Sequence, residues 1–594
     1  MAHLFRLSED YRMKIFIDLM WFFKQEKKSY LMGIILLLIV ALLELVPPKV
    51  IGMTVDFITQ GTLTKERLFK WLAILLGTAC TVYIVRFFWR VMIFGSSVKL
   101  ARLLRNQLYE HFTKMSQGFF QKRRIGDLMA HSTNDLQAIQ QTAGSGVLTL
   151  VDSLATGGFV LLMMAFTISW KLTLICLIPL PFMALSTNYY GTLLHRRFHK
   201  AQEAFSSLND KVQESVSGIK VIKTFGQEEE DIESFRKQSD DVVKKNLSVA
   251  KVDALYDPTI SLIVGISFFL AIVFGSRYVL AGEMTLGELV SFTTYLGLLI
   301  WPLLAFGWLF NIVERGRASY DRVQNLLNEP IEITDSKEPN EKTPTGHITY
   351  SISHFSYPGE QKQSLGDIHF SLNRGHTLGI VGKTGAGKTT LLKLLIREIE
   401  GYDGQILIGE NEIKSYTLNA LRKGIGYVPQ DHFLFSATVA DNIAFAKPNA
   451  SMKEIMEAAS LANIHEDILQ FTNGYETVVG ERGVSLSGGQ KQRISIARAL
   501  LLNPEILILD DSLSAVDAKT EEEILRALRE NRKGKTTIIT SHRLSAIQHA
   551  NQILVLEDGN IVQRGTHDEL MENEGWYRDM YQRQQLESLV EHGG

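Results

Sequence analysis

The chain has 594 residues, and its 62 Lys and Arg residues nearly balance its 64 Asp and Glu residues, giving a formal net charge of −2. A chain of this length is expected to form more than one domain. A hydrophobic share of 46 % against 21 % charged residues excludes a disordered chain. The near-neutral charge gives no electrostatic reason to expect a nucleic-acid partner. With only two cysteines, Cys80 and Cys176, the sequence also excludes a disulfide scaffold.

The first half of the sequence contains long uncharged runs, which are typical of membrane-spanning helices. Such a helix needs about 20 mostly apolar residues, and uncharged runs of this size cover 153–170, 172–194, 258–276 and 289–313. Two further apolar runs each contain one charge, Glu44 or Arg86. We therefore predict an α-helical membrane domain over 30–329. Its six helices are expected at about 30–50, 68–94, 144–169, 171–194, 258–280 and 287–313.

The distribution of Lys and Arg predicts how these helices are oriented. Segments 1–29, 95–144 and 190–258 hold six, seven and eleven of them, whereas the alternate loops 53–67, 169–171 and 276–287 hold two, one and one. Because positive charges favour the cytoplasmic side, both termini and both long loops are expected in the cytoplasm of a plasma-membrane protein. Residues 1–29 are expected to form a cytoplasmic helix lying at the membrane interface.

The two long cytoplasmic loops have polar, helix-forming sequences, so the membrane helices are expected to continue well beyond the bilayer. Residues 330–346 are rich in Pro, Glu, Lys and Thr and are predicted to be a linker. After it, 347–585 alternate short β-type runs with helical stretches, which predicts an α/β domain with a largely parallel sheet. Residues 586–594 are expected to be a C-terminal tail.

A phosphate-binding loop is the strongest motif of this second half. A buried-type strand over 377–381 precedes a Gly-rich run that ends in Lys and Thr, and a helical run follows. This is the P-loop pattern in its required strand–loop–helix context, in which backbone N–H groups surround phosphate oxygens. We expect Lys388 to reach the β- and γ-phosphates and the Thr389 hydroxyl to ligate Mg²⁺. The predicted ATP-binding residues of this loop are Gly382, Lys383, Thr384, Gly385, Ala386, Gly387, Lys388, Thr389 and Thr390.

Two other motifs are also typical of sites that bind phosphate and Mg²⁺. The aliphatic run 506–509 ends in Asp510, which is where a Mg²⁺-holding carboxylate is expected beside a P-loop. The turn Ser487-Gly488-Gly489-Gln490 opens a helix and offers a second anion site of N–H groups and a hydroxyl.

The order of these motifs resembles the nucleotide-binding domain of ABC transporters, and the six-helix region resembles an ABC exporter half-transporter. In that family two halves dimerise, and each ATP lies between one P-loop and the partner's LSGGQ signature. The resemblance implies an ATPase using ATP and Mg²⁺, with short coupling helices near 122–135 and 205–225. The further roles it implies are adenine stacking by Tyr357, Mg²⁺ sensing by Gln430, a D-loop containing Ser514 and Asp517, and a γ-phosphate switch at His542.

One position departs from the family pattern. The family usually has Glu after its Walker-B Asp, as the base that orients the attacking water, whereas this chain has Asp511. Aspartate is one methylene shorter, and base catalysis depends first on reach. The sequence therefore predicts slow hydrolysis at this chain's own P-loop beside an intact signature. This combination is similar to one half of the heterodimeric multidrug exporters of Gram-positive bacteria.

The sequence says least about the transported molecule. Glu44, Asp152 and Glu288 lie in or beside predicted spans, and intramembrane carboxylates are candidates for a substrate pathway. An ion pair with Arg86, or an interfacial position for Glu288, explains them equally well. We expect export of amphipathic small molecules through the lipid bilayer, together with a different half-transporter. A homodimeric lipid or peptide exporter and a nucleotide-gated regulatory or channel subunit remain alternatives.

Overall fold

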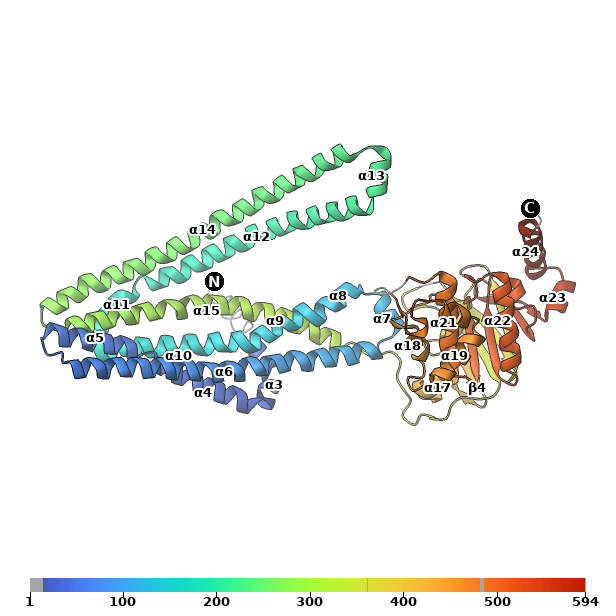
Figure 1. Cartoon of the computed structure of the whole chain (residues 1–594), viewed down its shortest axis with the longest axis horizontal. Coiled ribbons are helices and arrows are strands. Elements are labelled where there is room, and N and C mark those ends of the chain that lie inside the picture. Colours follow the sequence, from blue (N-terminus) through green and yellow to red (C-terminus); the bar gives the residue numbers. More distant parts are fainter. Residues whose placement is uncertain (1–13, 361, 481–484, 593–594) are drawn as a thin grey trace. The chain divides into compact units, whose positions relative to one another are not determined.

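The computed structural model describes residues 14–360, 362–480 and 485–592. The chain divides into two compact units, which are described separately (Figure 1). The first comprises Met1–Thr113 and Ile125–Glu329, and the second comprises Lys114–Arg124 and Pro330–Gly594. The first 13 residues of the predicted interfacial segment and the last two of the predicted tail lie outside the described residues.

The described part of the first unit is helical. Its long helices are α4 (Lys27–Leu43), α5 (Val46–Thr59), α6 (Lys65–Lys114), α10 (Val147–Met163), α11 (Trp170–Leu177), α12 (Leu180–Ser217), α14 (Glu228–Leu280) and α15 (Leu286–Leu327). Its shorter pieces are α2 (Lys14–Asp18), α3 (Met20–Gln25), α8 (Ile125–Ala130), α9 (Leu136–Gln141), α13 (Ile219–Phe225) and three π-helical turns, His131–Asp135, Thr142–Gly146 and Met164–Ser169.

Among the described residues, five helical stretches are long and apolar enough to cross a membrane. They are Lys27–Thr59, Lys65–Lys114, Ile125–Leu177, Glu228–Leu280 and Leu286–Leu327. Large apolar side chains such as Leu76, Phe166 and Leu262 are exposed on them, as expected for surfaces that face lipid. The predicted span 171–194 falls on α11 and α12, which are separated at Ile178 and Pro179 because proline lacks the N–H that continues a helix. The six-span topology therefore stays a prediction.

Helices α12 and α14 extend far past their apolar segments, as the polar, helix-forming loop sequence predicts. They pack side by side (Figure 1) and are joined through the short helix α13. Near that end Lys211 Nζ lies 2.6 Å from Asp231 Oδ1, linking the two helices. Gly226 ends α13 in the left-handed conformation that glycine adopts without strain.

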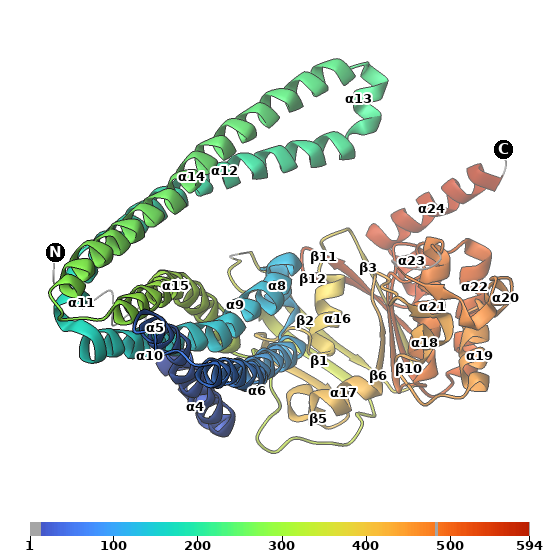
Figure 2. The ribbon, with the colours of Figure 1, turned by 60° about the vertical axis from the view of Figure 1, so that its left-hand side comes forward.

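The second unit contains two main sheets (Figure 2). The antiparallel sheet has the order β2-β1-β4-β5 and the larger sheet the order β12-β11-β3-β10-β9-β6, in which only β12 runs antiparallel to its neighbour. The strands are β1 (Ile348–Phe355), β2 (Leu365–Leu372), β3 (Thr377–Gly382), β4 (Asp403–Ile408), β5 (Asn411–Glu412), β6 (Ile425–Val428), β7 (Ala437–Thr438), β8 (Val478–Val479), β9 (Ile506–Asp510), β10 (Thr536–Thr540), β11 (Gln552–Glu557) and β12 (Asn560–Gly565).

Strand β9 is buried on both faces, which explains its continuous apolar sequence. In β9, Ile506 and Ile508 pack into a core shared with the antiparallel sheet and α16, whereas Leu507 and Leu509 pack against helices on the other face. The helices of this unit are α7 (Gln117–Gln121), α16 (Lys388–Leu395), α17 (Leu418–Gly424), α18 (Val439–Ala444), α19 (Met452–Leu461), α20 (His465–Leu469), α21 (Gly488–Leu501), α22 (Ala518–Asn531), α23 (His567–Glu572) and α24 (Trp576–His592). Helix α24 runs past the predicted domain end at 585.

Most of the predicted linker is bound to the second unit. Arg397 is only 2 % exposed, and its guanidinium donates to the carbonyl oxygens of Thr334 and Tyr416, each at 3.0 Å. Asp335 Oδ1 accepts from the N–H of Leu418 at 2.8 Å. The linker from 334 onward is therefore an ordered part of this unit.

The tip of the first long loop, Lys114–Arg124, also belongs to the second unit. Lys393 Nζ donates to Gln117 Oε1 at 2.7 Å, and Ser116 Oγ donates to Glu332 Oε2 at 2.5 Å. We expected a coupling helix near 122–135; the short helix that packs on the second unit is α7, a few residues earlier.

Candidate functional site

The candidate site lies where the parallel strands end. Because strands β3, β6, β9 and β10 are parallel, their carboxyl ends meet at one edge of the sheet, where α/β proteins commonly bind ligands. This edge carries a cleft of about 310 Å³. Of the predicted residues, those lining it are Tyr357, Thr384, Gly385, Ala386, Gly387, Lys388, Thr389, Thr390, Gln430, Asp510, Asp511 and His542.

The P-loop forms one wall of the cleft. Gly387 adopts φ +95°, and a Cβ there would lie 2.7 Å from Leu365 Cδ2, so this position requires glycine. Lys388 is nearly buried, and its Nζ donates to the carbonyl oxygens of Gly382 at 2.8 Å and Lys383 at 3.1 Å. Burial lowers the pKa of Lys388, while the nearby carboxylates Asp511 and Asp510 act in the opposite direction.

Not every predicted P-loop residue faces the cleft. Gly382 and Lys383 are absent from its lining. The ammonium of Lys383 instead lies 2.8 Å from Glu557 Oε1 at the surface. Tyr357 does line the cleft, and its hydroxyl lies 3.1 Å from Thr390 Oγ1 at the start of α16.

Asp510 is the buried centre of a hydroxyl cluster. It is 1 % exposed and accepts hydrogen bonds from Thr389 Oγ1 at 3.2 Å, Thr540 Oγ1 at 2.7 Å and the Tyr427 hydroxyl at 3.1 Å. Burial, together with Asp510, raises the pKa of Tyr427, so its phenol keeps the proton that it donates. The adjacent Thr389 hydroxyl and Asp510 carboxylate are oxygen ligands of the kind that Mg²⁺ prefers.

Asp511 follows β9 in an unusual backbone conformation, with φ +47°. Its N–H donates to Thr540 Oγ1 at 2.9 Å and to the Thr540 carbonyl at 3.0 Å, and its own carbonyl accepts from Ser514 Oγ at 3.0 Å. The side chain is 9 % exposed, and its Oδ1 has no hydrogen-bond partner among the described residues. An unsatisfied buried carboxylate oxygen lining this cleft fits a site that receives a cation or water with its ligand.

The signature turn lies outside this cleft. Ser487 caps helix α21: its Oγ accepts from Gln490 N at 3.2 Å, while Gln490 Oε1 accepts from Ser487 N at 3.1 Å. Gly488 and Gly489 form the first turn of the helix. None of these four residues lines the P-loop cleft.

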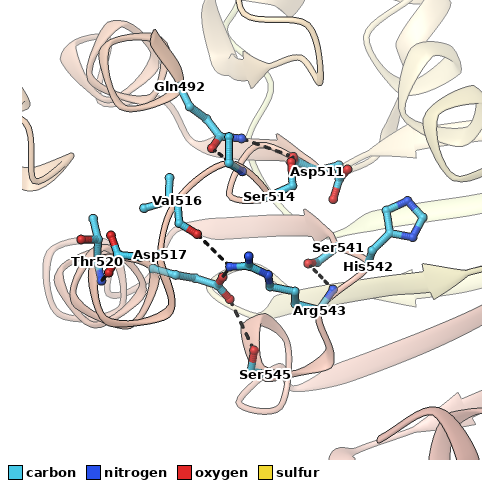
Figure 3. Close-up of polar contacts among 12 residues, drawn as sticks. Gln492, Asp511, Ser514, Val516, Asp517, Thr520, Ser541, His542, Arg543 and Ser545 are labelled. Atoms are coloured by element: carbon cyan, nitrogen blue, oxygen red, sulfur yellow. Dashed lines mark hydrogen bonds and ion pairs between the residues drawn. The ribbon is translucent and has the colours of Figure 1, made fainter. Parts of the chain in front are cut away.

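The D-loop connects the neighbouring elements (Figure 3). Gln492 of α21 accepts from Ala515 N at 3.0 Å and donates to the Asp511 carbonyl at 3.5 Å. Asp517 caps α22 by accepting from Thr520 N at 3.0 Å, and hydrogen bonds from Thr520 lower the pKa of Asp517. Ser514 and Asp517 therefore hold the loop in shape without lining the cleft.

Sequence reasoning missed several residues of the site. Thr540 and Tyr427 hold Asp510, and the cleft is completed by Glu360, Lys362, Gln363, Ser364, Asp558 and Gly559. Sequence analysis could have pointed to Thr540 and Tyr427, because each lies at or near the carboxyl end of a strand. The others come from surface turns whose sequences carry no recognisable motif.

The candidate substrate carboxylates have partners in the first unit. Glu44 forms an ion pair with Arg86, which is the alternative to a substrate-binding role that the sequence left open for it. Glu288 completes the capping box of α15, accepting from Thr285 N at 2.8 Å. Asp152 Oδ1 accepts from Thr156 Oγ1 at 3.2 Å. Each of the three carboxylates thus has a protein partner, and a place in a substrate pathway stays a prediction for all three.

A helical membrane unit and a P-loop unit in one chain define a membrane protein powered by a nucleotide. The ABC transporter transmembrane region matches residues 30–303, and the ABC transporter family matches residues 365–514. The chain belongs to the ABC transporters, with the two regions fused as in an exporter half-transporter, and it is an ABC-type ATPase. The predicted fold class is confirmed.

Several relatives align along nearly the whole chain. The probable multidrug resistance ABC transporter ATP-binding/permease protein YheI of Bacillus subtilis is 49 % identical over 96 % of this chain and 98 % of its own length. The multidrug resistance-like ATP-binding protein MdlA of Escherichia coli is 48 % identical over 98 % of both chains. An ATP-bound bacterial Atm1-family ABC exporter superposes with a TM-score of 0.77 at 27 % identity, covering 94 % of this chain and 98 % of that chain.

Proposed function

We propose that this chain is one half of a heterodimeric multidrug exporter, in which its own P-loop site binds ATP and hydrolyses it slowly. The observation that carries this proposal is Asp511. It occupies the position of the catalytic base with a side chain one methylene shorter than the family's usual Glu, while the signature helix cap is complete.

The cleft supports ATP binding through the chain's own groups. Lys388 is poised to exchange its two backbone carbonyl partners for phosphate oxygens, and the α16 N-terminus adds N–H donors. Thr389, Asp510 and Gln430 would hold Mg²⁺, which when bound neutralises charge on the β- and γ-phosphates. Tyr357 offers an aromatic face for adenine, and His542 is placed to donate to the γ-phosphate.

The geometry of Asp511 supports slow hydrolysis rather than loss of binding. Its backbone is fixed by Thr540 and Ser514, so the main chain has little freedom to move the carboxylate toward an attacking water. A misplacement of about 1 Å can cost about 10²-fold in rate. The hydrogen bonds that hold Lys388 are made to the carbonyl oxygens of Gly382 and Lys383 and not to Asp511.

The signature turn supports a composite site with a partner. Ser487, Gly488, Gly489 and Gln490 form an ordered helix start that does not line this chain's own cleft. In the proposed dimer this turn completes the partner's ATP site. If the partner has Glu as its base, that site performs the rapid turnover.

An aromatic surface beside Gln430 supports coupling to a membrane domain. Phe433 and Phe445 are exposed, and Phe435 stacks on Phe445 with ring centroids 4.5 Å apart. The guanidinium of Arg498 lies over both Phe435 and Phe445. We propose that a cytoplasmic loop of the partner half-transporter docks on these three Phe rings, so that movement of Gln430 reaches the membrane helices.

The relatives and the membrane unit support amphipathic small molecules as the cargo. YheI and MdlA carry multidrug-resistance names. Lipid export is the second candidate, because an ATP-dependent lipid A-core flippase of Syntrophus aciditrophicus is 34 % identical over 88 % of this chain. We place both termini in the cytoplasm, with Asp152 as the candidate contact for cationic drugs.

The test uses the chain purified alone and co-purified with the half-transporter encoded beside it. In the complex, Ser487→Arg in this chain should abolish most ATP turnover, whereas Asp511→Asn should leave it nearly unchanged. A homodimer would lose turnover with either substitution. Robust hydrolysis by the isolated chain that Asp511→Asn abolishes would overturn the proposal.

A further inference from the structure

The C-terminal helix α24 is held to the rest of the second unit by buried aromatic side chains and hydrogen bonds. Its Tyr577 is fully buried, and the Tyr577 hydroxyl lies 2.8 Å from His567 Nδ1 on α23. One turn later Tyr581 stacks parallel to Tyr577 and donates to Gln548 Oε1 at 3.3 Å. Gln584 lies seven positions after Tyr577 and three positions after Tyr581, so it shares a helix face with these two anchored side chains.

Gln584 forms hydrogen bonds with two backbone groups at and just after the candidate switch residue His542. Its Nε2 donates to the carbonyl oxygen of His542 at 2.7 Å, and its Oε1 accepts from the N–H of Leu544 at 2.9 Å. A single planar amide thus fixes two backbone groups that flank Arg543. This arrangement needs both a donor and an acceptor at the reach of glutamine.

The segment 541–543 is also hydrogen-bonded to the D-loop and the helix that follows it (Figure 3). The Arg543 guanidinium donates to the Val516 carbonyl at 2.8 Å and to Glu521 Oε2 at 2.9 Å. Ser541 Oγ accepts from Arg543 N at 2.9 Å. The backbone of His542 is therefore held between α24 on one side and the D-loop on the other, which leaves the imidazole facing the cleft.

We propose that Gln584 is a positioning residue for His542, and that the C-terminal helix thereby sets how strongly the site distinguishes ATP from ADP. This inference rests on the proposed contact of His542 with the γ-phosphate. ATP and ADP differ only in that phosphate, so a displaced imidazole weakens ATP binding and leaves ADP binding unchanged. Any shift of α24 would then be transmitted to the nucleotide through one side chain.

The test measures the affinities of the purified full chain for Mg-ATP and Mg-ADP by fluorescent-nucleotide displacement. Gln584→Ala should lower the ATP-over-ADP preference about five- to tenfold, which is part of the loss expected for the one hydrogen bond from His542 to a charged phosphate. Gln584→Glu keeps the acceptor for Leu544 N and loses the donor to His542, so it should lower the preference as well. Gln582→Ala, on an exposed position of the same helix, should behave as wild type.

A double-mutant cycle separates positioning from a general effect on stability. His542→Ala should lower the ATP preference, and adding Gln584→Ala should lower it no further. Equal losses of ATP and ADP affinity in Gln584→Ala, or additive effects in the double variant, would overturn the inference. If His542→Ala itself leaves the preference intact, the proposed role of His542 fails instead.

Discussion

Lengthening the side chain at position 511 should restore hydrolysis at this chain's own site. Asp511→Glu extends the carboxylate by about one C–C bond, roughly 1.5 Å, which covers a misplacement of about 1 Å that costs about 10²-fold. The expected gain is therefore up to about 10²-fold in single-turnover rate, or about 2.7 kcal/mol of barrier. The longer side chain sacrifices no hydrogen bond of Oδ1, because this atom has no hydrogen-bond partner among the described residues.

The same substitution carries a backbone cost. Position 511 adopts φ +47°, a left-handed conformation that Asp tolerates better than Glu, and this conformation costs most L-residues about 1–2 kcal/mol. This cost lowers the free energy of unfolding and does not enter the barrier to hydrolysis, so the rate should rise although the melting temperature falls by a few degrees.

The assay is single-turnover cleavage of radiolabelled ATP by the full chain. Asp511→Gln is the matched control, because it has the length of Glu without a basic carboxylate, and it should show no gain. If Asp511→Glu hydrolyses ATP no faster than wild type, or if Asp511→Gln gains equally, reach does not limit the base at this site.

Three further predictions follow from the ATP cleft and the membrane unit. Gly387→Ala should abolish ATP binding in nucleotide titrations, since its Cβ would lie 2.7 Å from Leu365 Cδ2 at φ +95°; Gly61→Ala, where no neighbour lies within 4 Å, should still bind ATP. ATP affinity should fall as pH rises through the lowered pKa of Lys388, because phosphate binds the protonated form and burial favours the neutral one; titrations from pH 7 to 10 should show a flat profile in Lys388→Arg. Glu288→Ala should cost about 1 kcal/mol of stability in thermal unfolding, because it removes the acceptor of the Thr285 N–H in the capping box of α15, and it should leave drug-stimulated ATPase activity intact; a changed drug response would place Glu288 in the substrate pathway.

Local sequence was sufficient where the chemistry depends on consecutive residues. The strand, Gly-rich loop and helix around Lys388 follow one another along the chain, so the pattern alone predicted them. Asp510 was found for the same reason, at the end of an aliphatic run. The continuous apolar sequence of β9 likewise indicates a strand that is buried on both faces.

The remaining features depend on contacts between distant segments. Tyr427 and Thr540 meet Asp510 only because three parallel strands align, and no local pattern records that pairing. The composition of 330–346 indicated a linker, yet Arg397, more than 50 residues later, binds its backbone. Charge alone could not separate Glu288 in a helix cap from a carboxylate in a substrate pathway, because both fit the same position near a helix start.

The capping box of α21 lowers the free-energy cost of forming a dimer interface in the proposed assembly. In Ser487 the hydroxyl oxygen accepts from Gln490, which leaves the hydroxyl proton available for an outside phosphate. The signature turn therefore meets its target already ordered, and it avoids about 0.5–1.5 kcal/mol of ordering cost for each side chain that would otherwise be immobilised on contact. Opening and closing of the dimer can then be governed by nucleotide occupancy, since the signature needs no folding step of its own.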